Sequence, residues 1–205
     1  MYIPDHYQNS DEDALRDFIL KNPFGIVVSN GPEAPLATHL PLQLLAEPDG
    51  SVCLYGHFAR ANDHWRHLAE GAPVCCIFNG PQSYVSSSWY REEEVPTWNY
   101  ISVHARGAYY VQSEAALLAS LHQMVDLYEK DSTHPVSLHN MSRKTMRQVR
   151  GIVGFRIAVT SLEGAWKLSQ GREDDHPRII EELERRGSAA SAVARAMKGP
   201  GNPGS

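Results

Sequence analysis

Short β-rich runs, separated by turn residues and with few helices between them, most constrain how this chain can fold. The first four runs, GIVVSN, LATHLPLQLL, SVCLYG and VCCIFN, cover 25–30, 36–45, 51–56 and 74–79. Asn-Gly-Pro, Pro-Asp-Gly and Gly-Pro turns lie between or after them. Further runs cover 100–111, 152–160 and 164–170. This spacing favours an antiparallel sheet closed into a barrel, because a doubly wound fold needs strand and helix to alternate throughout.

Capping residues and apolar periodicity place helices around this sheet. Ser10 begins an amphipathic helix that stops before Pro23, and Ser113 and Ser142 begin two more. Two short helices follow the last strand, over 177–187 and 188–197. We therefore expect a mainly β protein with flanking helices, of the α+β class. It forms a single domain over 1–198, and 199–205 is a disordered tail.

Composition narrows the setting and the partners. The three cysteines are an odd number, and Cys75 and Cys76 are neighbours that should point to opposite faces of a strand, which indicates a reducing, cytoplasmic setting. No signal peptide and no long uncharged apolar run is present, so no membrane association is expected. The formal charge is −5 and the segment IIEELERR is acidic, which argues against direct DNA binding.

The segment YGHFARANDHW, 55–65, joins a strand end to a helix start. A chain that enters a helix capped by Asn62 can aim backbone N–H groups at a phosphate, with Arg60 beside it. The alternative is an ordinary turn with an exposed arginine. His57 can be a core histidine, a hydrogen-bond donor to a cofactor or an axial haem ligand. His64 and His67 are three apart, but a solvated helix face is favoured over a metal site because no third ligand is recognisable.

Two more segments carry polar and aromatic groups together. Residues 80–100 combine five aromatic residues with serine, threonine and asparagine, which suits a planar, polar-edged ligand such as a flavin, a dimer contact, or packing of the loop on its own barrel. In KLSQ, 167–170, alternation places Lys167 and Ser169 on one face of the strand end. No serine lies in a nucleophile elbow.

Seven blocks of the sequence resemble one known family. They are MYIP, ATHLPL, GHFARAN, IFNGPQSYVSSSWY, VPTWNY, RGIVGF and KLSQ, in family order from Met1 to about residue 186. They resemble the PaiB-like family of FMN-binding negative transcriptional regulators. The resemblance implies an FMN-binding split β-barrel, related to pyridoxamine phosphate oxidases, that works as a homodimer with cofactor sites between subunits.

Residue by residue, the resemblance implies a set of flavin contacts. The phosphate would be held from ATHLPL and GHFARAN, and the ring would be approached from TWNY and KLSQ. The implied cofactor-binding residues are Thr38, His39, His57, Arg60, Asn62, Trp98, Asn99, Lys167 and Gln170. The chain departs from the family where SPSWY and KLSQN are usual, with Ser87 in place of proline and Gly171 in place of asparagine.

Several functions are compatible with this resemblance. The family name implies negative regulation of transcription, which we expect to be indirect, through flavin redox chemistry or a partner. FMN would make an oxidoreductase activity an option. An alternative is a haem-dependent enzyme, because piperazate synthases resemble the same family and use a histidine matching His57 as the iron ligand. Another alternative is a cofactor-free interaction module that uses the aromatic loops.

Overall fold

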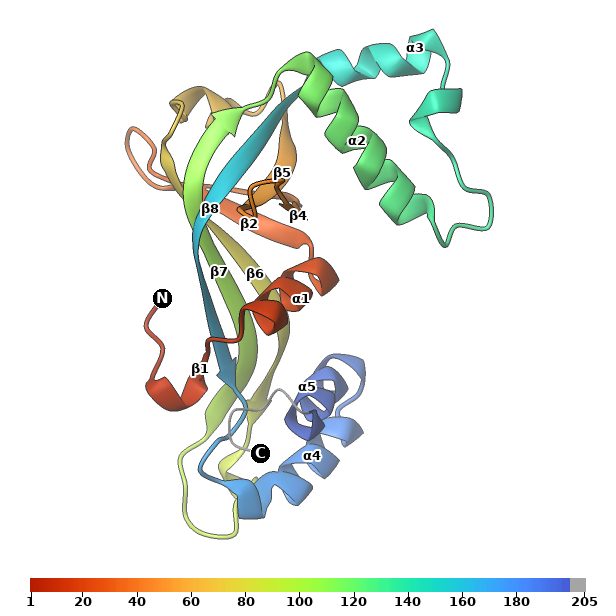
Figure 1. The fold of residues 1–205 in the computed structure, drawn as a ribbon. Helices are drawn as coiled ribbons and strands as arrows, with labels where there is room; N and C mark the ends of the chain where they lie inside the picture. Colours follow the sequence, from red (N-terminus) through yellow and green to blue (C-terminus); the bar gives the residue numbers. More distant parts are fainter. Residues whose placement is uncertain (200–205) are drawn as a thin grey trace. The chain divides into compact units, whose positions relative to one another are not determined.

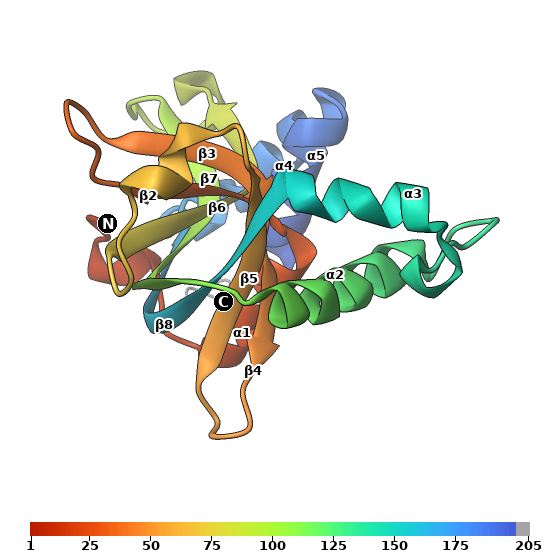
Figure 2. The ribbon, with the colours of Figure 1, turned by 90° about the horizontal axis from the view of Figure 1, so that it is seen from above.

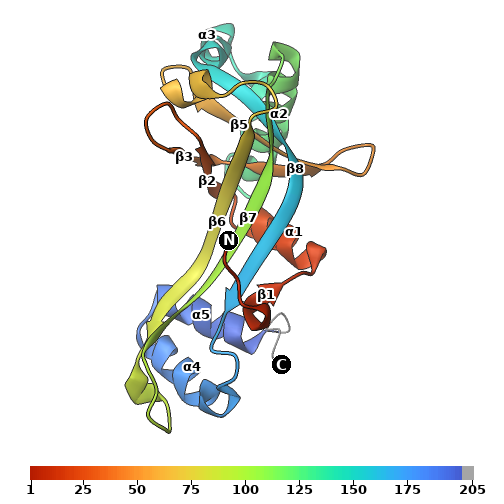
Figure 3. The same cartoon turned by 90° about the vertical axis from the view of Figure 1, so that its left-hand side faces the viewer.

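A computed structural model describes residues 1–199, so the predicted tail lies outside the described residues except for Gly199. It shows an eight-stranded antiparallel sheet with helices, which confirms the α+β expectation. The strand order is β3-β2-β6-β7-β8-β5-β4, and β1 pairs with β8. The strands are β1 (Gln8–Asn9), β2 (Phe24–Ser29), β3 (Leu36–Pro41), β4 (Gln43–Ala46), β5 (Val52–Ala59), β6 (Pro73–Val85), β7 (Thr97–Val111) and β8 (Ile152–Lys167). β6, β7 and β8 are long neighbours in the sheet (Figure 3).

The chain packs as two compact units. Unit 1 comprises Met1–Asn22, Ile77–His104 and the chain from Leu162 onward, and unit 2 comprises Pro23–Cys76 and Ala105–Ser161. The three long strands each contribute residues to both units. The whole formal charge of −5 belongs to unit 1, because unit 2 has nine basic and nine acidic side chains.

Unit 2 contains two antiparallel strand pairs formed by the first three predicted runs. β2 pairs with β3, and β4 pairs with β5. On its other edge, β5 pairs with β8, with Cys53 opposite Ala158 and Ala59 opposite Ile152. The predicted single run over 36–45 is broken at Leu42, whose side chain is buried and whose backbone N–H donates to the carbonyl of Pro23. α2 (Glu114–Glu129), capped by Ser113 as predicted, and α3 (Arg143–Met146) extend from the strands on the same side in Figure 2.

A glycine in β5 sets the packing under the strand end of unit 2. A Cβ atom on Gly56 would lie 2.8 Å from Cζ of Phe155 and 3.1 Å from methyl carbons of Leu40 and Leu42. Only glycine lets these fully or largely buried side chains close over the strand at this point. The next residue, His57, is thereby held at a rigid position.

Unit 1 is built from helices that bury one face each. α1 (Glu12–Lys21) is capped by Asp11 rather than by the predicted Ser10, since the Asp11 carboxylate accepts from the backbone N–H groups of Asp13 and Ala14. α4 (His176–Arg185) and α5 (Ser188–Lys198) pack side by side (Figure 1). Their apolar side chains are buried, which makes them core helices: Ile179, Leu183, Val193 and Ala194.

Two further sequence expectations can be compared with the strands. The runs 152–160 and 164–170 were predicted as separate strands, but a single strand, β8, is continuous from Ile152 to Lys167, and 168–170 lie beyond its end. Cys76 is fully buried and Cys75 is half-buried, which confirms that they face opposite sides of β6. None of the helices that the structure describes is long and apolar enough to cross a lipid bilayer.

Candidate anion-binding site

A pocket of about 300 Å³ in unit 2 brings together four of the residues expected to bind a cofactor. Thr38 and His39 come from β3, His57 comes from β5, and Asn62 lies in the loop that follows β5. The remaining walls are apolar and include Leu40, Pro41, Phe58, Ala59 and Ile152. No carboxylate lines the pocket, so an anion would meet donors and no like charge.

Asn62 fixes the geometry of the loop at this pocket. Its side-chain Oδ1 accepts from the backbone N–H of His64 at 2.9 Å, which caps the short 3-10 helix η2 (Asp63–His67). Because Oδ1 is used in this way, the amide nitrogen faces the other direction and donates to Oγ1 of Thr38 at 3.2 Å. The cap that was predicted therefore also links the loop to β3.

His64 is buried, which corrects the expectation that it lies on a solvated helix face with His67. Its Nε2 lies 2.9 Å from Oγ of Ser29 and its Nδ1 lies 2.8 Å from Oγ1 of Thr38. Burial, with a smaller effect of the nearby His67, holds the pKa of His64 below its ordinary value. His67 is exposed as expected. The sequence offered one signal of this burial, namely that His64 lies two residues after the capping residue Asn62.

His57 presents an uncommitted imidazole to the pocket. Burial lowers its pKa, so the ring is neutral near pH 7. Within residues 1–199, neither ring nitrogen has a hydrogen-bond partner. A neutral imidazole in this state can donate from one nitrogen and accept, or bind a metal, with the other. His39 is more exposed, and its ring stacks on Phe24 with centroids 6.3 Å apart.

Arg60 does not line this pocket but fastens the same loop to β8. Its Nε donates to the carbonyl of Arg150 at 2.7 Å and its Nη2 donates to the carbonyl of Ile152 at 2.9 Å. Its side chain lines a separate pocket of about 560 Å³ with Trp65 and Arg150. Arg60 thus holds the start of β8, including Ile152, against the loop.

Three of the backbone N–H groups in this loop already have partners within the protein. The backbone N–H groups of Arg60 and Asn62 donate to the carbonyls of Gly151 and Ala59, and that of His64 donates to the cap. The Arg60 bond ties the loop to the residue before β8, whereas the Asn62 and His64 bonds tighten the loop on itself at the short 3-10 turn. Side chains therefore supply further donors at the pocket.

The other four expected residues lie in unit 1. Asn99 is fully buried and exchanges hydrogen bonds with Ser169, at 2.8 Å and 3.1 Å. Gln170 folds back on its own turn, where it accepts from the backbone of Leu168 and donates to the carbonyl of Trp166. Both side chains are thus committed to holding the KLSQ turn.

Trp98 and Lys167 are the more accessible members of that set. The Trp98 ring is half exposed, meets the Tyr84 ring edge-on and donates from Nε1 to Gln82. Nζ of Lys167 donates to Oγ1 of Thr97 at 2.6 Å and lies 5.8 Å from the centroid of the Tyr7 ring. They offer an aromatic platform and a cation, respectively, at the surface of unit 1.

The two departures from the family pattern fit the local backbone. Gly171 has a φ of 79°, in the left-handed region that asparagine tolerates better than most other residues. Ser87 is the first residue of the 3-10 helix η3 (Ser87–Trp89), after the capping residue Ser86, where proline is also accommodated. Each substitution therefore preserves the conformation of its loop.

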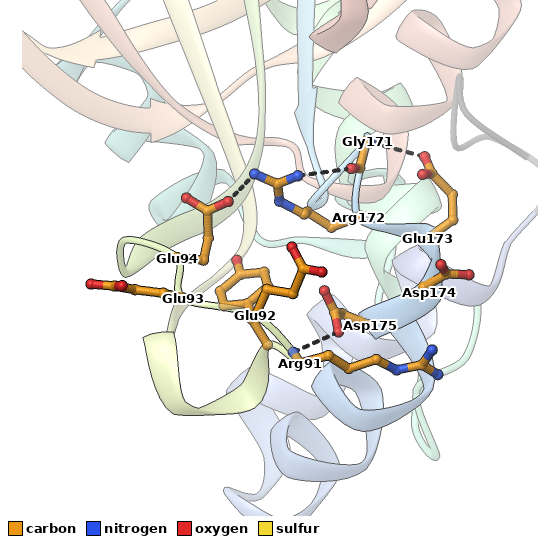
Figure 4. A pocket seen from close by; sticks show the side chains of 10 residues that line it. Arg91, Glu92, Glu93, Glu94, Gly171, Arg172, Glu173, Asp174 and Asp175 are labelled. Carbon is orange, nitrogen blue, oxygen red and sulfur yellow. Dashed lines mark hydrogen bonds and ion pairs between the residues drawn. The ribbon is translucent and has the colours of Figure 1, made fainter.

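A larger pocket in unit 1, of about 470 Å³, carries the opposite chemistry (Figure 4). Six carboxylates line it, from Glu92, Glu93, Glu94, Glu173, Asp174 and Asp175. Arg172 pairs with Glu94, and the Asp175 carboxylate accepts from the backbone N–H of Arg91 at 3.0 Å. These carboxylates disfavour an anion, in contrast to the pocket in unit 2, which no carboxylate lines. Among residues 1–199, no cluster of three or more acidic, histidine or cysteine side chains could hold a metal ion.

Comparison with known proteins gives the chain its relatives. The family model described as "Putative FMN-binding domain" matches residues 1–161. The protein named "Protease synthase and sporulation protein PAI 2" of Bacillus subtilis is 39% identical over 186 residues, which cover 90% of this chain and 89% of that protein.

Solved structures share the fold at low sequence identity. The structure titled as an FAD and haem binding protein from Mycobacterium smegmatis has a TM-score of 0.62 and 18% identity, covering 78% of this chain and 73% of that one. The flavocytochrome Anf3 from Azotobacter vinelandii has a TM-score of 0.61 and 15% identity, covering 86% and 78%. These likenesses match the antiparallel α+β sheet to flavin-binding split-barrel structures. The chain belongs to the family described as "Putative FMN-binding domain" and is a homologue of PAI 2.

Proposed function

We propose that this protein binds FMN and that the pocket of Thr38, His39, His57 and Asn62 receives the phosphate. The observation that carries this proposal is the convergence of hydroxyl, amide and imidazole groups from β3, β5 and the following loop in a pocket without carboxylates. A phosphate dianion needs several donors at once, and hydrogen bonds to an ionised acceptor are stronger than neutral ones. The family match supports the choice of FMN among phosphate-bearing ligands.

The size of the pocket restricts which part of FMN it holds. Pockets that hold a whole small molecule have volumes from about 300 to 1,000 Å³. This pocket, at about 300 Å³, is at the lower limit of that range, so it suits the phosphate end of the cofactor rather than the whole molecule. Arg60, on the adjoining loop, contributes positive charge from Nη1, which has no protein partner among the described residues. The ring then needs a separate surface.

Residues of unit 1 are proposed to supply that surface. Trp98 provides a half-exposed aromatic plane and Lys167 a cation suited to the polar edge of the ring. Asn99 and Gln170 act behind them by fixing the TWNY strand and the KLSQ turn. In this proposal the protein is a homodimer, and the unit 1 groups come from the partner copy.

Bound FMN would supply one- and two-electron redox chemistry, so the protein is a candidate flavin-dependent oxidoreductase. We propose that negative regulation of transcription follows indirectly from this redox function or from a protein partner. Unit 1, which carries all of the net negative charge, is poorly suited to a DNA backbone. The direct test is a promoter DNA shift across a salt series, and binding that weakens steeply with salt would contradict the indirect mechanism.

Haem is the second candidate ligand, and the state of His57 favours considering it. A neutral imidazole without a hydrogen-bond partner is the form that ligates iron. In that case the protein would be a haem-dependent enzyme with His57 as axial ligand. A third candidate is a cofactor-free interaction module, for which the exposed Trp98 and Val95 would provide the contact surface.

Absorption spectroscopy of the purified protein, titrated with FMN and then with haem, separates these three functions. A bound flavin spectrum supports the proposal, and a Soret band that His57→Ala abolishes supports the haem enzyme. The absence of binding for both ligands leaves the interaction module. Thr38→Val should weaken FMN binding about tenfold and leave riboflavin binding unchanged, because the hydroxyl is proposed to reach the phosphate and not the ring. The same change removes the bonds of this hydroxyl to Asn62 and His64, so a melting curve checks that the variant stays folded. Thr133→Val, in an exposed loop, is the matched control.

A further inference from the structure

A line of hydrogen-bonding side chains runs behind the pocket wall. Asn62 Nδ2 donates to Oγ1 of Thr38 at 3.2 Å, and this oxygen lies 2.8 Å from Nδ1 of His64. On the far side of the imidazole, Nε2 lies 2.9 Å from Oγ of Ser29, which lies 3.3 Å from the carbonyl of Asn30. His64 and Ser29 are buried, so each of these groups depends on the others for its partners.

The direction of the line is fixed only at the Asn62 end. Because Oδ1 of Asn62 accepts from the His64 backbone, Nδ2 has to donate to Thr38. A threonine hydroxyl has one proton and two lone pairs, and Asn62 occupies one lone pair. The bond between Thr38 and His64 can therefore run in either direction, and the tautomer of the imidazole decides which.

In the first arrangement, Thr38 donates its proton to Nδ1 of His64. The ring proton is then on Nε2 and is donated to Ser29, which donates to the carbonyl of Asn30. Every proton is used inside the chain, and Thr38 offers none to the pocket. This arrangement suits the protein without a ligand.

In the second arrangement, the ring proton is on Nδ1 and is donated to Thr38, while Nε2 accepts from the Ser29 hydroxyl. The Thr38 oxygen then accepts two hydrogen bonds, and its own proton is free for a ligand in the pocket. A hydroxyl that accepts two bonds is also the better donor, because hydrogen bonds in a chain polarise one another. The imidazole carries one ring proton in both arrangements.

We propose that His64 is the positioning residue of this site, and that an anion in the pocket selects the tautomer with the proton on Nδ1, which turns the Thr38 hydroxyl toward the anion. The proposal rests on the proposed function, because it concerns the same pocket. A residue that does not line the pocket would thus decide the preference of the site for a ligand that accepts hydrogen bonds. The Phe58 ring, whose centroid lies 5.1 Å from that of His64, covers the imidazole on the side of the apolar core.

Long-range proton–nitrogen NMR of protein labelled with nitrogen-15 in histidine tests the tautomer directly, with inorganic phosphate as the probe. The expected result is a proton on Nε2 of His64 without phosphate and on Nδ1 at saturation. Phosphate binding with an unchanged tautomer overturns this inference alone. If the wild-type protein binds neither phosphate nor FMN, the proposed function fails and the inference with it.

Two substitutions give an independent measurement. The amide of His64→Asn occupies the place of Nδ1 and can donate to Thr38, whereas His64→Leu cannot, and both lose the bond to Ser29. We expect His64→Leu to weaken phosphate binding about tenfold and His64→Asn to stay close to wild type. His67→Asn, on the exposed side of η2, is the control and should leave binding unchanged. Equal affinities of the Asn and Leu variants would overturn the proposal, and the wild-type NMR result stands if either variant fails to fold.

Discussion

His57 on β5 lies directly opposite Gly154 on β8 in the antiparallel pairing. Directly opposite residues share a face of the sheet, so the paired strand contributes no side chain that could cover the imidazole at this position. A Cβ atom on Gly154 would lie 2.6 Å from Cδ1 of Leu117 in α2, which shows how closely the helix approaches the strand there. The glycine thus serves two purposes, because it admits the helix and leaves His57 uncovered by its cross-strand neighbour.

Buried histidines should make this protein less stable in mild acid. Burial lowers the pKa of His57 and of His64 from the ordinary value of 6.5. As pH falls below 6.5, the unfolded chain binds protons that the folded chain does not, so the free energy of unfolding falls. Urea unfolding at pH 7.5 and 5.5 measures this loss, which should be smaller in His57→Gln. If His57→Gln lost as much unfolding free energy as the wild type between pH 7.5 and 5.5, His57 would have the same pKa in the folded and unfolded chain.

Arg60→Ala should weaken FMN binding more than riboflavin binding, by about tenfold, because the guanidinium charge is proposed to act on the phosphate. It should also lower thermal stability, since Nε and Nη2 no longer bind the carbonyls of Arg150 and Ile152. Isothermal titration with both flavins and a melting curve measure the two effects.

Arg66→Ala is the matched control for Arg60. Arg66 is exposed and pairs with Asp63 three residues before it on η2, so its loss removes one positive charge near the loop without touching the β8 carbonyls. We expect little change in either measurement. If Arg60→Ala weakened FMN and riboflavin binding equally, the assignment of Arg60 to the phosphate would be wrong.

Gly56→Ala should destabilise unit 2 by about 1–3 kcal/mol, because the new methyl group overpacks the core against Phe155, Leu40 and Leu42. The control is Gly151→Ala, where a Cβ atom would have no neighbour within 4 Å. Chemical denaturation of the two variants checks the difference. Equal stabilities would mean that β5 shifts freely and that His57 is not held as described.

Ser169 has a φ of 64°, and it is the one non-glycine residue with a positive φ among the described residues. Its side chain bonds Asn99 inside unit 1. Both Ser169→Ala and Ser169→Gly lose this bond, but glycine also relieves the backbone, so the Gly variant should be more stable than the Ala variant by about 1 kcal/mol. Unfolding free energies of the pair isolate the strain. A more stable Ala variant would contradict this explanation.

The sequence predicted the fold class well because its signals are local. The hairpin at 25–41 and the helices capped by Ser113 and Ser142 follow from apolar alternation, turn residues and caps that lie within a few positions of each other. The predictions of strand boundaries were wrong where the pattern of side chains does not determine the path of the backbone. The break at Leu42 and the continuity of β8 depend on pairing with segments elsewhere in the chain.

For the candidate site, too, the sequence predicted the residues that lie in local motifs but not their long-range contacts. The blocks ATHLPL and GHFARAN identified Thr38, His39, His57 and Asn62 by residue type, and the structure places these four around one pocket. The assignment of Arg60 to a phosphate stays a prediction, and the structure adds a role that no local motif indicated. Two of its guanidinium nitrogens donate to the carbonyls of Arg150 and Ile152, 90 and 92 residues away.

By itself, the sequence determined the fold class, most of the strand and helix order, the family, and the donors that gather at the pocket, because each depends on short contiguous motifs. Only the tertiary structure decided which histidine supports that pocket. His64 is buried by contacts with Ser29 and Thr38, which are 35 and 26 residues distant in sequence. The partners of a side chain across such separations depend on how the strands pack, and no local pattern around His64 encodes that packing.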